Sequence, residues 1–427
     1  MVRFFSKIAA VFILSLALSA CSVLPLKKGS SPVTLKLWGL WESATTMNQV
    51  INDYKKLHPN VNIVYEKKSV QQYRESLQAQ IQSAKGPDIF MFHNTWTPML
   101  KNELTAVPSN VVSSSDFKSN YFPTVASDLR NSSGSYVGVP AGIDGLGLYW
   151  NQDIFNAAGI VAPPTTWQEL AQVAAKLTVR DTSGNIRTAG AAIGTASNVD
   201  QFSDILGMMI MQNGGDLKKP TSQLTADALD YYTHFAKGQN RVWDETLPSS
   251  TIAFAGGNLA MYLGPSWRAA EIKQANPLLN FKVAPVPQLE GGKLAWASYW
   301  AYGVSAKSPS QQSAWDFVKY LQDDQTLIKI YSEDAKTPGM LFGPPYPKIA
   351  LAQKLSQDPI VGAFVTDAPY MRSFPMAART YDNGLNDQII KAYEDAVNKV
   401  LAGSSPSSAL ATAATNVQNV LNRFGAQ

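Results

Sequence analysis

The apolar residues between Val33 and Phe92 change regularly from strand spacing to helix spacing, and this order limits the possible folds more than any other feature of the chain. The segments follow one another as strand, helix, strand, helix and strand, at residues 33–38, 47–57, 61–65, 73–84 and 88–92. The last strand is apolar at every position after Asp88, which is typical of a strand covered on both faces. This order requires right-handed crossovers and predicts a mostly parallel sheet flanked by helices.

The remaining sequence continues this α/β pattern and is too long for a single hydrophobic core. Strands are predicted at residues 146–150, 259–263 and 281–286, and helices at residues 167–177, 200–211, 311–321, 385–401 and 409–424. Thr165 or Thr166 is suited to cap the helix at 167–177. Because roughly 400 residues exceed what one core usually serves, two domains are expected.

The N-terminus has the features of a bacterial lipoprotein signal peptide. The apolar run from Ile8 to Leu18 is too short to span a membrane but long enough for a signal-peptide core. It leads into Leu18-Ser19-Ala20-Cys21, which resembles the lipobox in which the cysteine is acylated after cleavage. Cys21 is the only cysteine among 427 residues and cannot form an internal disulfide, so its position favours lipidation over an ordinary secretion signal.

Residues 1–20 are therefore predicted to be a signal peptide and residues 21–32 a flexible tether. Acyl chains on Cys21 would hold an extracytoplasmic protein at the cell membrane, which it would contact only through this anchor. The net charge of +4 is small and dispersed, which gives no support to nucleic acid as a partner. Ten Trp and 17 Tyr beside only 16% charged residues suit the binding of a neutral polar ligand.

Seven sequence phrases follow one another along nearly the whole chain. They are WGLWE (38–42), HPNVNIVYE (58–66), GPDIFMFH (86–93), YVGVPAGIDGLGLYWNQDIFNAAGI (136–160), PPTTWQELAQVAAKL (163–177), FAGGNLAMYLGPSW (254–267) and YGVSAKSPSQQSAWDFVKYL (302–321). This ordered set resembles the family 1 extracellular solute-binding proteins, the group that includes maltose-binding protein. Each phrase alone is a weak signal, but their common order is specific.

The resemblance implies a two-lobed, periplasmic-binding-protein-like fold of type II. Each lobe would be a mostly parallel sheet flanked by helices, with a ligand cleft between the lobes. Residues 33–141 with 302–342 would form the first lobe and residues 142–301 with 343–427 the second, with crossings near 140–145, 298–303 and 340–347. The family also implies a monomer without cofactor that closes around a small solute and delivers it to the permease of an ABC importer.

The candidate ligand-binding residues are the stacking and hydrogen-bonding side chains at strand ends or in the crossings. Open α/β sheets bind ligands at the carboxyl ends of their strands, where helix N-termini also present free amides. Arg379 and Tyr381 are included because residues 371–381 resemble the stretch in which maltose-binding protein contributes a stacking aromatic. The full set is Trp41, Glu42, Asn94, Trp96, Asp144, Trp267, Arg268, Ser298, Tyr299, Trp300, Arg379 and Tyr381.

Several of these assignments have structural alternatives. Trp41 could pack within its lobe, Glu42 could be a solvated acid, and Arg268 could pair with a structural acid. Because alternate residues of an extended chain face opposite ways, Ser298 and Trp300 should share a side while Tyr299 faces the other. At least one of these three should therefore be core.

Competing functions lack their expected residue patterns. Polyamine capture needs several converging acids, and glycerol-phosphate capture needs clustered arginines. A glycoside hydrolase needs paired carboxylates, for which Glu42 and Asp144 are the available pair. The common hydrolase motifs are missing and the three histidines show no metal-ligand spacing, so neither catalytic residues nor a metal site are predicted. A mono- or oligosaccharide is the expected ligand.

Overall fold

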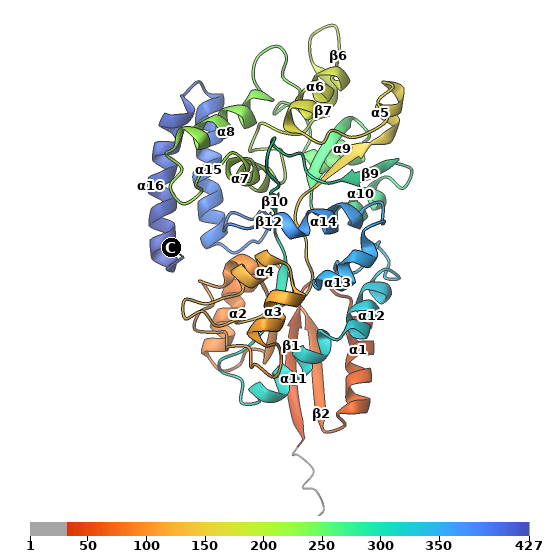
Figure 1. Ribbon diagram of the computed structural model, residues 1–427, viewed down its shortest axis with the longest axis vertical. Coiled ribbons are helices and arrows are strands. Elements are labelled where there is room, and N and C mark those ends of the chain that lie inside the picture. Colours follow the sequence, from red (N-terminus) through yellow and green to blue (C-terminus); the bar gives the residue numbers. More distant parts are fainter. Residues whose placement is uncertain (1–31, 427) are drawn as a thin grey trace, which may run out of the picture.

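The structure is a computed structural model that describes residues 32–426. Within these residues it contains two five-stranded sheets, each flanked by helices, which confirms the α/β fold class predicted from the sequence. Figure 1 shows the two sheets in separate halves of the molecule, one above the other. The predictions for residues 1–31, including Cys21, lie outside the described part of the chain.

The first sheet, in the lower half of Figure 1, contains the strands predicted at the start of the chain and has the order β2-β1-β3-β11-β4. The strands β1 and β2 run parallel, as do β1 and β3, whereas β11 runs antiparallel to β3 and β4. Every residue of β3 is buried, as its unbroken apolar sequence predicts. The elements of this half are β1 (Val33–Gly39), α1 (Ala44–Leu57), β2 (Val61–Lys67), α2 (Tyr73–Gln82), β3 (Ile89–His93), η1 (Asn94–Trp96), α3 (Ser114–Asn120), α4 (Pro123–Asp128), β4 (Val139–Pro140), β11 (Trp300–Val304), α11 (Gln311–Leu321) and α12 (Asp324–Asp334).

The second sheet has the order β6-β7-β8-β5-β9 and corrects the expectation of a mostly parallel sheet in each lobe. Of its pairings within residues 32–426, that of β7 with β8 is parallel and the others are antiparallel. The reason is the path of the chain, because β5 and β11 enter their sheets directly from a crossing between the halves. Each of these strands begins at the edge where the parallel strands end, so it runs antiparallel to them. The strands are β5 (Gly147–Asn151), β6 (Val179–Arg180), β7 (Ile186–Ala191), β8 (Leu259–Gly264) and β9 (Phe281–Ala284).

Four helices of the second half, at residues 167–177, 202–212, 385–401 and 406–424, form at or close to the residues where the apolar spacing predicts them. Thr166 caps α6 in a reciprocal capping box with Glu169, which satisfies free backbone amides at the helix start. The helices α15 and α16 pair with each other along one side of this half and pack on α8 (Figure 1). The remaining elements are α5 (Gln152–Ala157), α6 (Trp167–Leu177), α7 (Phe202–Gln212), α8 (Gln223–His234), α9 (Ser250–Ala255), α10 (Arg268–Ala275), β10 (Ala295–Trp296), α13 (Ile349–Ala352), η2 (Gln353–Leu355), α14 (Val361–Asp367), η3 (Ala368–Tyr370), β12 (Met371–Arg372), α15 (Leu385–Leu401) and α16 (Pro406–Phe424).

Three segments, within residues 140–145, 298–303 and 340–347, run between the two halves and are hydrogen-bonded to one another. The backbone N–H of Ser298 donates to the carbonyl of Asp144 at 3.0 Å, and that of Ile143 donates to the carbonyl of Pro345 at 2.9 Å. The strand β11 pairs with β3 from Trp300 onward. The chain therefore joins the first sheet two residues before residue 302, the boundary predicted from the sequence. We call these three segments the hinge.

Gly145 is the tightest point of the hinge, and its substitution tests this packing. A Cβ at Gly145 would lie 1.8 Å from the carbonyl oxygen of Trp296, and a clash with backbone cannot be relieved by a rotamer change. Gly145→Ala is expected to lower the free energy of unfolding by about 3 kcal/mol, as overpacking does. Gly292→Ala is the matched control because nothing lies within 4 Å of its Cβ. Urea unfolding measures both variants, and equal stabilities would contradict the packing described.

Candidate ligand-binding site

Four aromatic rings meet where β1 and β3 end and β11 begins. Trp300 makes edge contacts with Trp41, His93 and Trp96, at ring-centroid distances of 5.4, 5.2 and 5.1 Å. Trp41 is 40% exposed and Trp300 is partly exposed, whereas His93 and Trp96 are buried. The cluster therefore presents two indole surfaces at the carboxyl ends of the parallel strands.

His93 is the member of this cluster that the sequence reasoning missed. Its Nδ1 lies 2.8 Å from Thr95 Oγ1, and its Nε2 lies 3.1 Å from Ser298 Oγ. Burial lowers the pKa of His93 to about 3, so the ring is neutral near pH 7. The histidine orients Ser298 without carrying charge. Its place directly before Asn94, at the end of the third strand, is the signal that could have found it.

Glu42, predicted to accept hydrogen bonds from a ligand, lies in the interior instead. It is 1% exposed, and the Tyr302 hydroxyl donates to its Oε1 at 2.8 Å. Burial raises the pKa of this carboxyl above its usual value and outweighs the hydrogen bond from Tyr302. The assignment is wrong because the chain beyond β1 turns Trp41 outward and Glu42 into the core.

Asn94, Trp96 and Tyr299 also belong to the interior, which corrects their assignment to ligand contact. Asn94 donates to Asp128 Oδ2 at 2.8 Å and accepts from the backbone N–H of Tyr299 at 3.2 Å, and the Tyr299 hydroxyl donates to the same carboxylate at 3.1 Å. Trp96 has no exposed surface. Burial raises the pKa of Asp128, which also accepts from Ser373 at 2.7 Å. This network joins the two halves and occupies the polar atoms that the prediction gave to the ligand.

Asp144 lies within the hinge, but its carboxylate is occupied by the protein. The backbone N–H groups of Gly145 and Ser266 donate to Oδ1 at 2.8 and 3.1 Å, and the Ser266 hydroxyl donates to Oδ2 at 2.8 Å. Burial raises the pKa of Asp144 to about 7 despite these bonds. Asp144 therefore positions the end of β8 against the hinge, and this replaces its predicted role as a ligand acceptor.

Trp267 and Arg268 directly follow Ser266 at the start of α10. Trp267 is 42% exposed, and Cζ of Arg268 lies 4.4 Å from the centroid of its ring. Arg268 is only 4% exposed, and its Nη1 pairs with Glu271. The structural acid considered for Arg268 thus exists, but it engages one nitrogen of the guanidinium. Trp267 adds an exposed indole from the second half beside the hinge.

Arg379 and Tyr381 lie together on the segment between β12 and α15. Arg379 forms an ion pair with Asp200, and its Nη1 donates to the Tyr381 hydroxyl at 3.4 Å. Burial pushes the pKa of Asp200 upward, but the hydrogen bonds from Thr251 and the charge of Arg379 bring it below its usual range. Arg379 and Tyr381 have φ values of 61° and 49°, which cost a non-glycine residue about 1–2 kcal/mol each. Such strain persists where surrounding contacts enforce it, often at ligand sites.

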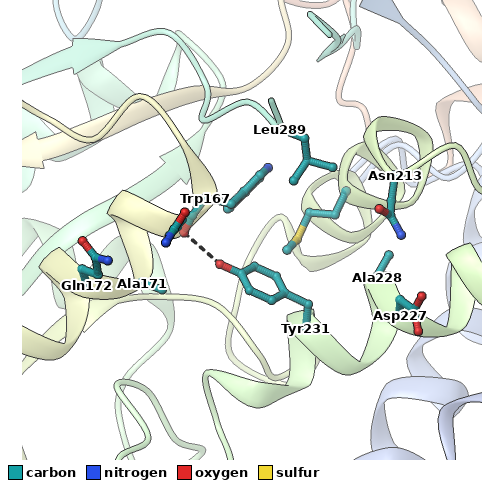
Figure 2. A pocket seen from close by; sticks show the side chains of 10 residues that line it. Trp167, Ala171, Gln172, Asn213, Asp227, Ala228, Tyr231 and Leu289 are labelled. Carbon is teal, nitrogen blue, oxygen red and sulfur yellow. Dashed lines mark hydrogen bonds between the residues drawn. The ribbon is translucent and has the colours of Figure 1, made fainter. Parts of the chain in front are cut away.

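A hollow of about 460 Å³ lies elsewhere, between α6, α7 and α8 (Figure 2). The Tyr231 hydroxyl donates to the Trp167 carbonyl at 2.8 Å in its wall. None of the candidate ligand-binding residues lines this hollow. Among residues 32–426, no group of three or more His, Cys, Asp or Glu side chains is placed to hold a metal ion.

Two curated relatives match most of the chain. A probable ABC transporter-binding protein of Deinococcus radiodurans is 23% identical over 366 residues, which cover 80% of each chain. An sn-glycerol-3-phosphate-binding periplasmic protein of Yersinia enterocolitica is 23% identical over 95% of this chain and 97% of its own.

Solved structures show the same two-lobed fold. An ABC transporter solute-binding protein of Thermotoga lettingae, crystallised with α-D-tagatose, superposes with a TM-score of 0.69 and 24% identity over 91% of this chain and 99% of its own. The model of the family described as bacterial extracellular solute-binding protein matches residues 49–363. This match covers well over half of the sequence, so the chain belongs to the bacterial extracellular solute-binding proteins.

Proposed function

We propose that this protein is the lipid-anchored binding component of an ABC importer and that it captures a mono- or oligosaccharide between its two lobes. One observation carries the proposal: partly exposed indoles from both halves gather at the hinge. Trp41 and Trp300 come from the first half, and Trp267 comes from the second. Sugar-binding sites need apolar faces that cover the C–H surfaces of the ring, and indoles supply them.

Hydrogen bonds through Asp144 link the backbone segments that carry Trp267 and Trp300. Ser266, which precedes Trp267, is bonded to the Asp144 carboxylate, and the Asp144 carbonyl accepts from Ser298, just before Trp300 in the chain. A solute held among these indoles would touch both lobes, so closure around the hinge would exclude water and strengthen its polar contacts. The hydroxyl of Ser298, which His93 orients, and the Arg379–Tyr381 segment are the polar groups we assign to this role.

The comparisons support a transport role and are compatible with two classes of ligand. The tagatose bound to the Thermotoga protein supports a sugar, and the names of that protein and of the Deinococcus relative support delivery to an ABC importer. The glycerol-3-phosphate-binding relative supports a phosphorylated polyol as the alternative. Polyamine capture has no comparable support, since Glu42, Asp128 and Asp144, the acids described above, are bonded to protein groups.

We infer that the ligand leaves the site unaltered. A glycosidase requires two free carboxyl groups that flank the scissile bond. The pair offered by the sequence does not meet this requirement, because Glu42 is buried against Tyr302 and Asp144 is bonded to Ser266 and Gly145. Capture and release without chemistry is therefore the activity that the side chains fit.

We place the protein outside the cytoplasm, anchored through acyl chains on Cys21, and we expect a monomer that docks on its permease. The family description supports an extracellular location. In the described part of the chain, no helix has the length and apolarity needed to cross a membrane. A lipid anchor at Cys21 would supply the membrane attachment.

A ligand screen tests the proposed function directly. Purified protein should gain thermal stability with at least one neutral sugar or oligosaccharide, because a ligand at one hundred times its Kd adds about 2.7 kcal/mol of stability. Spermidine should give no shift. Chromatography of the recovered oligosaccharide should show the starting compound alone, and shorter products would establish a glycosidase instead. A shift with spermidine and with no carbohydrate would overturn the ligand class.

Trp41→Ala tests the indole cluster, with Trp96→Ala as its matched control. Loss of the exposed Trp41 ring should weaken binding of the sugar found in the screen about tenfold or more, as for an aromatic anchor, while changing the stability of the unliganded protein by about 1 kcal/mol. Trp96→Ala should instead cost about 3–5 kcal/mol of stability because that ring is wholly buried. Calorimetric titration and urea unfolding separate the two effects. Undiminished affinity in Trp41→Ala would remove the cluster from the site.

Cys21→Ser tests the anchor in cells. Without the thiol no acyl chain can attach, so the protein should move from the membrane fraction to the soluble extracytoplasmic fraction. Immunoblotting of the fractions, together with radiolabelled palmitate incorporation, provides the measurement. A variant that remains membrane-bound and labelled would show that Cys21 is not the lipidation site.

A further inference from the structure

Arg268 has a buried edge that no protein group satisfies. Its Nη1 pairs with Glu271, but Nε and Nη2 have no hydrogen-bond partner among residues 32–426 and are shielded from solvent. These two nitrogens lie side by side on the guanidinium and can donate two parallel hydrogen bonds to a single acceptor group. The edge that best recognises a planar acceptor is therefore the edge that remains free.

Leaving such an edge empty is energetically costly. A buried charged group needs both a counter-charge and hydrogen bonds for its remaining protons. Glu271 is about half exposed, so its charge is screened by water and compensates Arg268 only in part. The side chain is thus arranged for a second acceptor.

The surrounding acceptors are already engaged elsewhere. Asp200, a carboxylate in electrostatic contact with Arg268, binds Arg379 and Thr251. The hydroxyl of Tyr149 donates to the carbonyl of Pro265 at 2.6 Å. The Asp200 carboxylate and the Tyr149 hydroxyl therefore already have partners within the protein.

The free edge lies beside the proposed cleft. The guanidinium carbon is 4.4 Å from the ring centroid of Trp267, and this indole is 42% exposed. Ser266, one residue earlier, is bonded to Asp144 in the hinge. A ligand group that displaces or slides beneath this indole would reach Nε and Nη2 while the rest of the ligand packs on the indole.

We propose that Arg268 is a specificity residue that binds the oxyanion of an acidic sugar or phosphorylated polyol through Nε and Nη2, with Trp267 covering the contact. This inference rests on the proposed function and names the chemistry of the ligand group. A carboxylate or phosphate carries two acceptor oxygens on one centre and matches the two parallel donors. A neutral sugar offers hydroxyls that cannot match the charge of this edge.

Paired ligands distinguish the two sources of this chemistry. Calorimetric titration of the purified protein would compare D-galacturonate with D-galactose, D-glucuronate with D-glucose, and sn-glycerol 3-phosphate with glycerol. At least one acid should bind tenfold or more tightly than its neutral partner, and the pair that does so identifies carboxylate or phosphate. Equal or tighter binding of the neutral partners in all three pairs would overturn the proposal and leave the proposed sugar-binding function intact. Binding of none of these compounds would overturn it as well.

Variants of Arg268 separate recognition from structure. Arg268→Met should weaken binding of the preferred acid about 100-fold, because one side of a buried charge pair is lost, and should leave the neutral partner within about twofold. Arg268→Lys keeps the charge but loses the parallel donors. Its affinity for the preferred acid should therefore lie between those of the wild-type protein and Arg268→Met. The melting temperature of unliganded Arg268→Met should not drop, since an unsatisfied buried charge is removed.

Arg187→Met serves as the control because it removes the same charge from an exposed surface position of the same half. It should leave both affinities unchanged. If Arg268→Met lowers the unliganded melting temperature and keeps its affinity for the acid, Arg268 is a structural residue and the proposal fails. A crystal structure with the acid that shows only an ordered water at Nε and Nη2 would have the same consequence.

Discussion

The hydrogen bonds that hold the three hinge segments together are the constraint on which the site depends. Asp144 is their centre: its carboxylate fixes Ser266 at the end of β8, and its carbonyl fixes Ser298 before β11. The distance between the indoles of the two halves is set through these contacts. A domain movement that preserved them would rotate the halves about the hinge and leave the backbone beside Trp267 and Trp300 in place.

Burial, and not position along the chain, decides which polar side chains remain free for a solute. The strand-end argument predicts which segments meet at the ends of the strands but not the direction in which each side chain points. Trp41 and Glu42 are adjacent, yet Trp41 faces solvent, whereas Glu42 is buried and its carboxylate accepts a hydrogen bond from the Tyr302 hydroxyl. The expected alternation across residues 298–300 is confirmed, because Tyr299 is buried while its two neighbours are partly exposed. Alternation within an extended segment is local geometry, which is why it could be predicted.

Local patterns predicted most of the elements, whereas long-range pairing was beyond their reach. The helices α11 and α15 begin and end where their apolar spacing indicates, and the first three strands of the first sheet pair in parallel. The direction of β5 could not be read from its sequence, because it depends on which half the chain has just left. The roles of Asp128 and His93 could not be predicted for the same reason, because their hydrogen-bond partners are far away in the chain.

The segment from Arg379 to Asn383 has a strained backbone that is held by contacts with both halves. Arg379, Tyr381 and Asn383 all have positive φ, although none is a glycine. Contacts from both halves oppose the cost: Arg379 pairs with Asp200 in the second half, and Asn386 at the start of α15 donates to Thr95 Oγ1 in the first half at 2.8 Å. A conformation enforced from both sides can persist only while the two halves keep their relation. In the proposed binding cycle, the position of Arg379 would therefore depend on the opening of the cleft, and a solute that contacts this arginine would favour the closed arrangement through the same contacts.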